Sequence, residues 1–311
     1  MTSETLYAWL ASVERSVTGV KRALDVRMDR EEIAFLKFQA IRARRFMLNL
    51  GARHRIRLHY GAMTSAVEIL TLLYARWLTR DPSRPGWAAR DRFVLSKGHA
   101  APALYVALWQ AGFFPASEFE GFRRIGSRLQ GHPDRSKTPG VDCTTGSLGQ
   151  GFPVACGMAL AAGLERAPWK AYACISDGEC NEGSTWEAAL IAANLRLDHL
   201  VVLVDVNGKS SYGRMEGRNG VEPLADKWRA FRWQTFDCDG HDFVSLSRAL
   251  ADAEAVPGGP AAVLCRTVKG KGIPWAERND ARSNYLLEDA PCAEALASLD
   301  AQEEELRRGG P

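Results

Sequence analysis

The chain has 311 residues, of which 46% are hydrophobic and 25% charged, and its formal net charge is +3. This composition is typical of a globular protein with a sizeable core. The small net charge gives no reason to expect nucleic acid as a partner.

The sequence carries no sign of export or of a membrane anchor. The N-terminal residues include Glu4 and Glu14 and lack the apolar core of a secretory signal. Residues 152–164, the longest apolar stretch, are too few and too rich in small residues to span a membrane. None of the seven cysteines forms a Cys-x-x-Cys pair, which favours reduced thiols. We therefore expect a cytoplasmic protein.

The first part of the chain is predicted to be helical. Residues 1–40 are expected to form an N-terminal helical extension, followed by a basic cluster. This cluster is expected on a solvated helix face, or as a docking surface for an acidic partner, and it comprises Arg42, Arg44, Arg45, Arg53, Arg55 and Arg57. Apolar residues at helical spacing predict an amphipathic helix over residues 64–78, which Thr64 or Ser65 could cap.

From residue 92 onward, short apolar strands alternate with helices. The strands are predicted at residues 92–96, 171–176, 199–205, 233–238 and 262–268, and the helices at 101–113, 146–163, 182–194 and 243–254. This alternation predicts an α/β fold with three layers, in which helices cover both faces of a parallel sheet. We expect one domain over residues 1–311, ending in an exposed helical tail at 290–311.

Polar residues follow two neighbouring strands. Asp177 and Gly178 come directly after one strand, and Asn207 follows the next. Open α/β sheets bind ligands at this edge. Asp and Asn oxygens suit a hard cation such as Mg²⁺, and the helix beginning near Glu182 points its N–H groups towards a phosphate.

The same segment resembles the thiamine diphosphate motif, which begins Gly-Asp-Gly and ends in Asn about thirty residues later. Here the first glycine is replaced by Ser176. The resemblance implies that Asp177, Asn207 and the carbonyl of Lys209 bind Mg²⁺, Ca²⁺ or Mn²⁺, and that Gly178 and Glu179 contact thiamine diphosphate.

Four further segments resemble transketolases and occur in the family's order. They are Leu58-His59-Tyr60-Gly61, RDRFVLSKGHA at 90–100, GHP at 131–133 and PGVDCTTGSLGQG at 139–151. The resemblance covers roughly residues 40–272 and implies the thiamine diphosphate-binding fold of that family.

Three histidines lie in these segments. By resemblance, His99 serves the cofactor diphosphate and the substrate hydroxyl region, and His59 and His132 surround the ketose hydroxyls. Neutral imidazoles can donate to and accept from hydroxyl groups, so the roles are chemically reasonable. The other histidines are assigned to structure, and they are His54, His199 and His241.

Further roles come from the same resemblance. Gly146, Ser147 and Leu148 would face the cofactor, with packing as the alternative for the apolar residue. Glu182 and Glu187 would join an acid network that reaches the active-site glutamate of a partner, although an acid near a helix start also stabilises the helix dipole.

One family feature is missing. A Lys-Gly-Lys-Gly segment at 269–272 matches transketolases, but no histidine follows His241. Ser283 or Asn284 could replace the family's diphosphate-binding histidine. The departure keeps two alternatives open: other thiamine diphosphate chemistry, such as 2-oxoacid decarboxylation or acyl transfer, and a non-catalytic cofactor-binding subunit.

The chain is too short to contain the second, pyrimidine-binding domain of a whole transketolase. We therefore expect a companion subunit that supplies this domain, in an α2β2 assembly. The implied reaction moves a two-carbon ketol unit from a ketose or ketose phosphate to an aldehyde acceptor.

Overall fold

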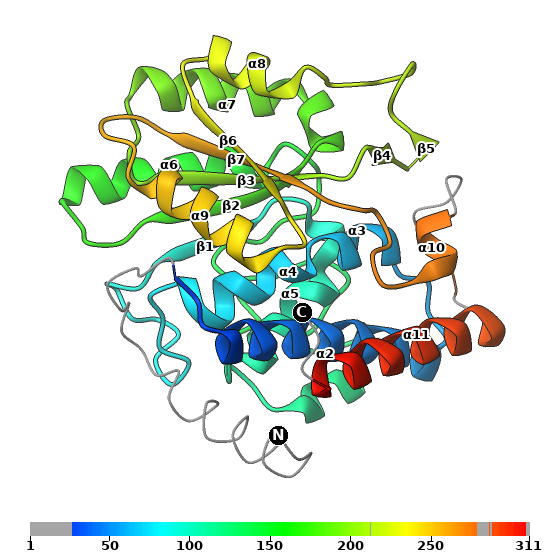
Figure 1. The fold of residues 1–311 in the computed structure, drawn as a ribbon. Coiled ribbons are helices and arrows are strands. Elements are labelled where there is room, and N and C mark those ends of the chain that lie inside the picture. Colours follow the sequence, from blue (N-terminus) through cyan, green and yellow to red (C-terminus); the bar gives the residue numbers. More distant parts are fainter. Residues whose placement is uncertain (1–26, 212, 279–285, 287, 309–311) are drawn as a thin grey trace.

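The computed structural model describes residues 27–211, 213–278, 286 and 288–308. Its centre is a parallel sheet of five strands in the order β1-β2-β3-β7-β6 (Figure 1). The strands are β1 (Arg92–Leu95), β2 (Ala171–Ser176), β3 (Leu200–Val206), β6 (Gln234–Asp239) and β7 (Ala261–Arg266). The register pairs Ser176 with Asp205, so β2 and β3 end at the same edge.

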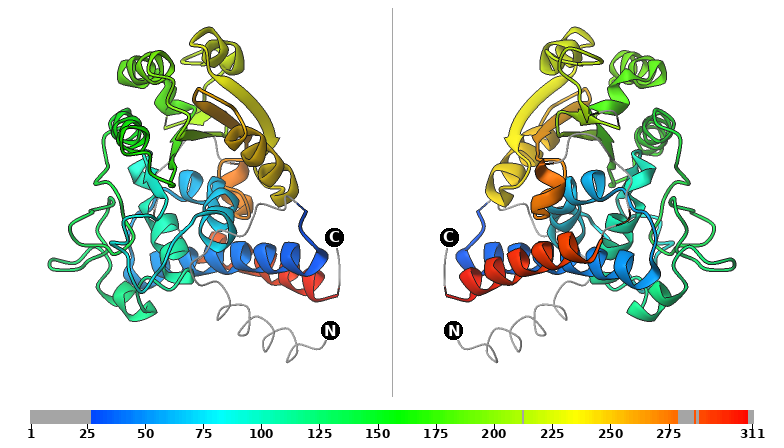
Figure 2. Two further views of the ribbon diagram at one scale, coloured as in Figure 1. Left: turned by 90° about the vertical axis from the view of Figure 1, so that its left-hand side faces the viewer. Right: turned by 90° about the vertical axis from the view of Figure 1, so that its right-hand side faces the viewer.

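Helices cover both faces of this sheet (Figure 2). One face carries α6 (Gly151–Glu165), α7 (Gly183–Asn194) and α8 (Leu224–Ala230). The other carries α2 (Arg30–His54), α3 (Tyr60–Ser65), α4 (Val67–Leu72), α5 (Ala101–Gln110) and α9 (Phe243–Glu254). Successive strand residues face opposite sides, and each side has its own apolar cluster, which explains why β3 is apolar at every position except Asp205.

Short elements complete the chain. The helical turns are η1 (Leu73–Trp77), η2 (Gly98–Ala100), η3 (Ala116–Gly121) and η4 (Gly178–Asn181), and α10 (Pro274–Arg278) and α11 (Asp289–Arg307) come last. A small antiparallel hairpin joins β4 (Lys209–Ser210) to β5 (Gly213–Arg214). No helix within the described ranges is both long enough and apolar enough to cross a membrane.

The predicted layers and strands agree with the structure, with boundary shifts of one or two residues. The helix predicted at 146–163 begins only at Gly151, because residues 146–150 form a loop. The prediction of one amphipathic helix at 64–78 is wrong, because the segment is neither a single helix nor exposed on one face. Residues 60–74 form three successive helical pieces and are all buried, since the sheet-facing core and neighbouring helices surround them.

The predicted caps of that helix are also wrong. Neither Thr64 nor Ser65 caps the start of α4, which follows Ala66 without a side-chain hydrogen bond. The Thr64 hydroxyl donates to the carbonyl of Tyr60, and the Ser65 hydroxyl donates to the carboxylate of Asp205. A bond within α3 therefore uses the Thr64 hydroxyl, and a tertiary contact uses the Ser65 hydroxyl.

The solvated arginine face and the exposed tail are wrong in part. Arg44 is 3% exposed and donates to both Glu68 oxygens, at 2.7 and 2.8 Å. Arg45 pairs with Asp300 and Glu303 of α11, at 2.7 and 2.5 Å. The tail helix therefore packs along α2 (Figure 1). Residues 1–26 of the predicted extension lie outside the described residues.

The buried pair between Arg44 and Glu68 predicts a pH-dependent stability. Burial opposes ionisation of Glu68, but Arg44 and His241 outweigh it and lower its pKa to about 2 from 4.5. The ionised carboxylate therefore stabilises the fold above about pH 4.5, and this contribution is lost as the pH falls through about 2. Near neutral pH, we expect the wild type to have a free energy of unfolding about 3 kcal/mol higher than that of Glu68→Gln.

Urea unfolding of the wild type and of Glu68→Gln, at a series of pH values from about 6 down to about 3, measures this difference in the free energy of unfolding. The gap should narrow as the pH falls. Glu304→Gln, in an exposed ion pair with Arg308, is the control and should change stability little at any pH. A pH-independent gap between wild type and Glu68→Gln would contradict the assignment.

Candidate cofactor and metal site

Asp177 and Asn207 meet at the carboxyl edge of the sheet. The Asp177 amide donates to the Asp205 carbonyl at 3.2 Å, which continues the pairing of β2 with β3. The Asp177 carboxylate accepts from the amide of Gly208 at 2.6 Å and from that of Gly178 at 2.7 Å. Because Gly208 follows Asn207 directly, this contact places the two predicted metal ligands in neighbouring loops.

A cavity of about 660 Å³ opens beside these loops. Its lining includes Asp177, Asn207, Lys209 and Lys269. The size falls in the range of small-molecule sites. Carboxylate, amide and carbonyl oxygens are present beside ammonium groups, so the residues suit both a hard divalent cation and a diphosphate.

The surroundings of Asp177 favour a bound cation. Burial and the Asp205 carboxylate raise the pKa of Asp177 to about 6. A divalent cation would favour the charged form. Among the described residues no group of three His, Cys, Asp or Glu side chains could hold a metal.

Lys269 is a site residue that the sequence analysis did not assign. Its ammonium donates to the carbonyls of Ser210 at 2.6 Å and Lys209 at 3.2 Å. Burial lowers its pKa to about 8. The Lys209 carbonyl has a second lone pair, so it can accept from Lys269 and still face a cation. The Lys-Gly-Lys-Gly segment was the sequence signal for this residue.

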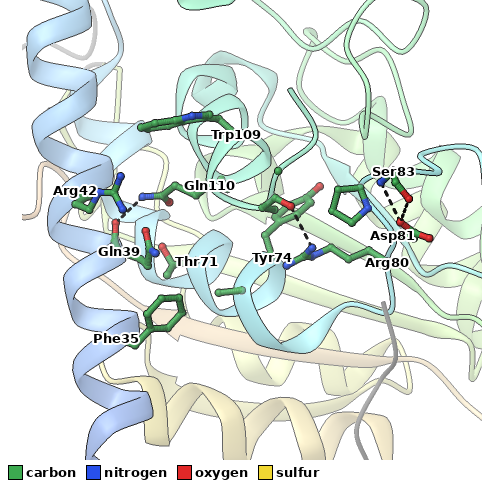
Figure 3. A pocket seen from close by; sticks show the side chains of 15 residues that line it. Phe35, Gln39, Arg42, Thr71, Tyr74, Arg80, Asp81, Ser83, Trp109 and Gln110 are labelled. Atoms are coloured by element: carbon green, nitrogen blue, oxygen red, sulfur yellow. Dashed lines mark hydrogen bonds between the residues drawn. The ribbon is translucent and has the colours of Figure 1, made fainter. Parts of the chain in front are cut away.

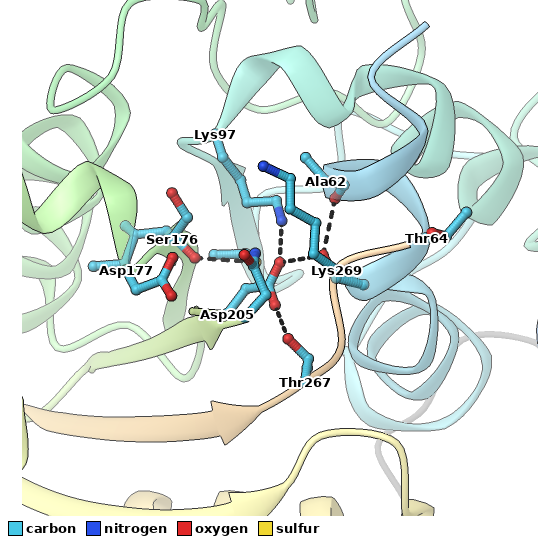
Figure 4. Close-up of polar contacts among 12 residues, drawn as sticks. Ala62, Thr64, Lys97, Ser176, Asp177, Asp205, Thr267 and Lys269 are labelled. Carbon is cyan, nitrogen blue, oxygen red and sulfur yellow. Dashed lines mark hydrogen bonds and ion pairs between the residues drawn. The ribbon is translucent and has the colours of Figure 1, made fainter. Parts of the chain in front are cut away.

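A buried ion pair lies beside Asp177 (Figure 4). Lys97, at the end of β1, pairs with Asp205, and neither side chain is exposed. The Asp205 carboxylate also accepts from Ser65 at 2.6 Å and from Thr267. This network was missed as well, although a charged residue inside the apolar strand HLVVLVD is an unusual feature that could have indicated it.

The three predicted histidines gather near this network. The rings of His59 and His99 lie 5.1 Å apart, centroid to centroid. Burial, together with Lys97, lowers the pKa of His99 to about 3, so its imidazole is neutral. His132 is exposed and lies against Gly146, where an added Cβ would sit 3.6 Å from the ring.

The structure separates the predicted acids. Glu179 is fully buried, and its carboxylate accepts from Ser96 and from the amide of Gly149 at 2.8 Å. Burial raises its pKa. These hydrogen bonds connect the 146–151 loop to η4. The predicted contact of Glu179 with a cofactor stays a prediction. Glu182 and Glu187 are exposed at the start of α7.

The other predicted positions are placed as follows. Ser147 is exposed and Leu148 half-buried in the loop before α6. His54, His199 and His241 each bond within the fold, to the carbonyls of Phe119 and Trp169 and to Glu68, respectively. Ser283 and Asn284 lie outside the described residues.

Comparison with known proteins agrees with this geometry. Residues 39–296 match the family of the transketolase thiamine diphosphate binding domain. The chain belongs to the transketolase family. The predictions of family, α/β fold and thiamine diphosphate-dependent transketolase-type subunit are confirmed.

Several members of the family are clearly similar to this chain. A 6-deoxy-6-sulfo-D-fructose transketolase subunit from a Clostridium species is 43% identical over 78% of this chain and 89% of the relative. An apulose-4-phosphate transketolase subunit from Actinobacillus succinogenes is 40% identical, over 78% and 86%. The solved transketolase from Leishmania mexicana aligns with a TM-score of 0.71 and 27% identity. The match covers 88% of this chain and 46% of that one, so this transketolase-family chain spans under half its length.

The close approach of two loops predicts a sensitive glycine. A Cβ added to Gly98 would lie 2.9 Å from the backbone of Thr145 and Gly146. Backbone cannot move aside as a flexible side chain does, so Gly98→Ala should separate the segments that carry His99 and Gly146. We expect a loss of about 1–3 kcal/mol in the free energy of unfolding and weaker binding of thiamine diphosphate by calorimetry.

Gly157→Ala is the matched control. A Cβ there would meet no atom within 4 Å, and the position lies inside α6. The free energy of unfolding of this variant should be about 0.5–1 kcal/mol higher than that of the wild type. The variant should bind the cofactor as the wild type does. Equal behaviour of the two variants would refute the close-packing argument.

Proposed function

We propose that this chain is the diphosphate-binding subunit of a split transketolase, which transfers a two-carbon ketol unit from a ketose or ketose phosphate to an aldehyde. The observation that supports this most directly is the contact between the Asp177 carboxylate and the Gly208 amide at 2.6 Å, beside the cavity that Lys269 lines. Thiamine diphosphate supplies, when bound, the electron sink for cleavage of the carbon–carbon bond.

We assign the metal to three oxygen donors of this chain. They are the Asp177 carboxylate, the Asn207 side-chain amide oxygen and the Lys209 carbonyl, which line one cavity. Mg²⁺ needs few protein ligands because phosphate oxygens and water complete its shell, and Ca²⁺ or Mn²⁺ accept the same donors. Lys269, on the same cavity wall, adds positive charge for the diphosphate.

The histidines are assigned to the substrate side. His99 is half-buried and neutral, so it can donate to one oxygen while accepting from another. His59 stands edge-on to it, and exposed His132 borders the same loops. Together they would hold the ketose hydroxyl groups and pass protons between them.

The outer face of α6 and α7 is assigned to the companion subunit. Leu190 and Ile191 are 47% and 54% exposed, and they follow Glu187 by three and four residues on α7. Residues at these spacings share one helix face. Val154 and Leu164 of the neighbouring α6 are 43% and 77% exposed. An apolar face bordered by acids suits a pyrimidine-binding subunit that needs Glu182 and Glu187, in an α2β2 assembly.

We propose a cytoplasmic location because of the state of the cysteines. All seven cysteines are free thiols, and six of them are buried. Reduced cysteines of this kind are typical of cytosolic proteins.

The first test of the function is consumption of a ketose phosphate with an aldose phosphate acceptor, in the presence of thiamine diphosphate and Mg²⁺. We expect activity only when this chain is co-expressed with its companion. Asp177→Ala should abolish that activity and weaken cofactor binding by at least about tenfold. Asp198→Ala, exposed at the opposite end of β3, should leave both unchanged.

Three results would count against the proposal. Activity of this chain alone would contradict the need for a companion. Full activity of Asp177→Ala would favour a non-catalytic subunit. Turnover of 2-oxoacids without turnover of any ketose would assign a different thiamine diphosphate-dependent reaction.

The companion surface has its own test. Ile191→Asp places a charge on this apolar face, and we expect the affinity for the companion to fall by at least about tenfold in a size-exclusion titration. Ala297→Asp adds the same charge to an exposed position of α11 and should not affect assembly. Unchanged assembly of Ile191→Asp would place the interface elsewhere.

A further inference from the structure

A second cavity lies away from the cofactor site and has no assigned role. It occupies about 600 Å³ between α2, η1, the loop at residues 78–83 and the end of α5 (Figure 3). It shares no lining residue with the cavity at Asp177. Its lining includes three aromatic residues, which are Phe35, Tyr74 and Trp109.

Arg80 is the unusual residue of this wall. It is only 6% exposed, and its one hydrogen bond among the described residues is a weak contact of 3.5 Å with the Ala111 carbonyl. Asp81, its neighbour in the chain, is already engaged by Ser83 and Arg84, at 2.6 and 2.7 Å. No carboxylate of the described chain therefore compensates the buried guanidinium.

Arg44 shows how this protein treats a buried arginine that serves only the fold. It is 3% exposed and bonds to two Glu68 oxygens and to the carbonyls of Thr64 and Lys271, all within 3.1 Å. Arg80 has no such set. A buried charge without a partner is costly, so the contrast indicates a partner that is not part of the described chain.

Two further observations agree. Burial lowers the pKa of Arg80 to about 10, and only Tyr74 acts in the opposite direction. In the same wall, Gln39 is 3% exposed, and its side-chain oxygen has no hydrogen-bond partner in the described structure. An unsatisfied buried acceptor is rare in a complete interior, so this wall has capacity to bind a ligand.

The charge and lining of the cavity define the ligand. Arg80 can compensate one negative charge in a bidentate contact. Figure 3 shows Arg42, the other arginine of the wall, at the opposite end of the cavity, where its guanidinium lies 5.9 Å from the Trp109 ring centre. Between them the wall is mostly aromatic or aliphatic. A phosphate dianion would bring a second charge that Arg80 cannot neutralise.

We propose that this cavity is a binding site for a small organic monocarboxylate, whose carboxylate pairs with Arg80 and whose apolar body packs against Tyr74 and Trp109. The volume lies within the range of sites for such molecules. The site is separate from ketol transfer and does not depend on the proposed function.

Calorimetric titration of the full chain with phenylacetate tests the proposal. We expect saturable binding at one site. Phenylacetamide has the same shape without the charge, and it should bind at least about tenfold more weakly. This comparison needs no variant protein.

Arg80→Leu should remove phenylacetate binding, and because it also removes an uncompensated buried charge, it should fold at least as stably as the wild type. Arg80→Met is the second variant. Arg124→Leu, in an exposed loop outside the cavity, is the charge-matched control and should bind normally.

The proposal is overturned if phenylacetate gives no saturable binding or binds no better than phenylacetamide. Unchanged binding in both Arg80 variants would also overturn it. Tighter binding of inorganic phosphate than of phenylacetate, dependent on Arg80, would replace the carboxylate by another anion class.

Discussion

The Asp205 carboxylate, at the end of the central strand β3, connects the segments that form the carboxyl edge of the sheet. It pairs with Lys97 after β1 and accepts from Ser65 of α3 and from Thr267 after β7. Its backbone carbonyl accepts from Asp177. One buried charge thus joins four segments that are distant in the sequence. Such a charge is stable only when all of its partners are present, so the site forms together with the sheet edge or not at all.

The same edge explains how the work is divided between chains. The cavity and the neutral imidazole of His99 belong to this chain, as do the oxygen atoms of Asp177, Asn207 and Lys209 that we propose as metal donors. Glu182 and Glu187, by contrast, point outward beside exposed apolar side chains of α7. In the proposed function these two acids reach the companion subunit, so the site would be complete only in the assembly. We therefore propose that this chain supplies the buried contacts of the site and that the interface with the companion supplies the remaining groups.

Buried charges also distinguish structure from binding elsewhere in the molecule. Arg44 and Arg80 are almost equally hidden, but only Arg44 has a full set of partners. Exposure alone would assign both to the core. Counting the hydrogen bonds that each guanidinium makes separates a residue that holds α2, α4 and the 269–272 turn together from one that lines an open cavity.

The sequence by itself determined the order of strands and helices along the chain, the motif residues Asp177 and Asn207, and the transketolase family. Apolar runs and motif spacings are local, so they can be read without knowing which segments meet. The tertiary structure alone decided that residues 60–74 are buried on every side, that Arg44 pairs with Glu68, and that Lys97 pairs with Asp205. Burial and ion pairing join residues far apart in the chain, as with the 108 positions between Lys97 and Asp205, and no local pattern encodes such a contact.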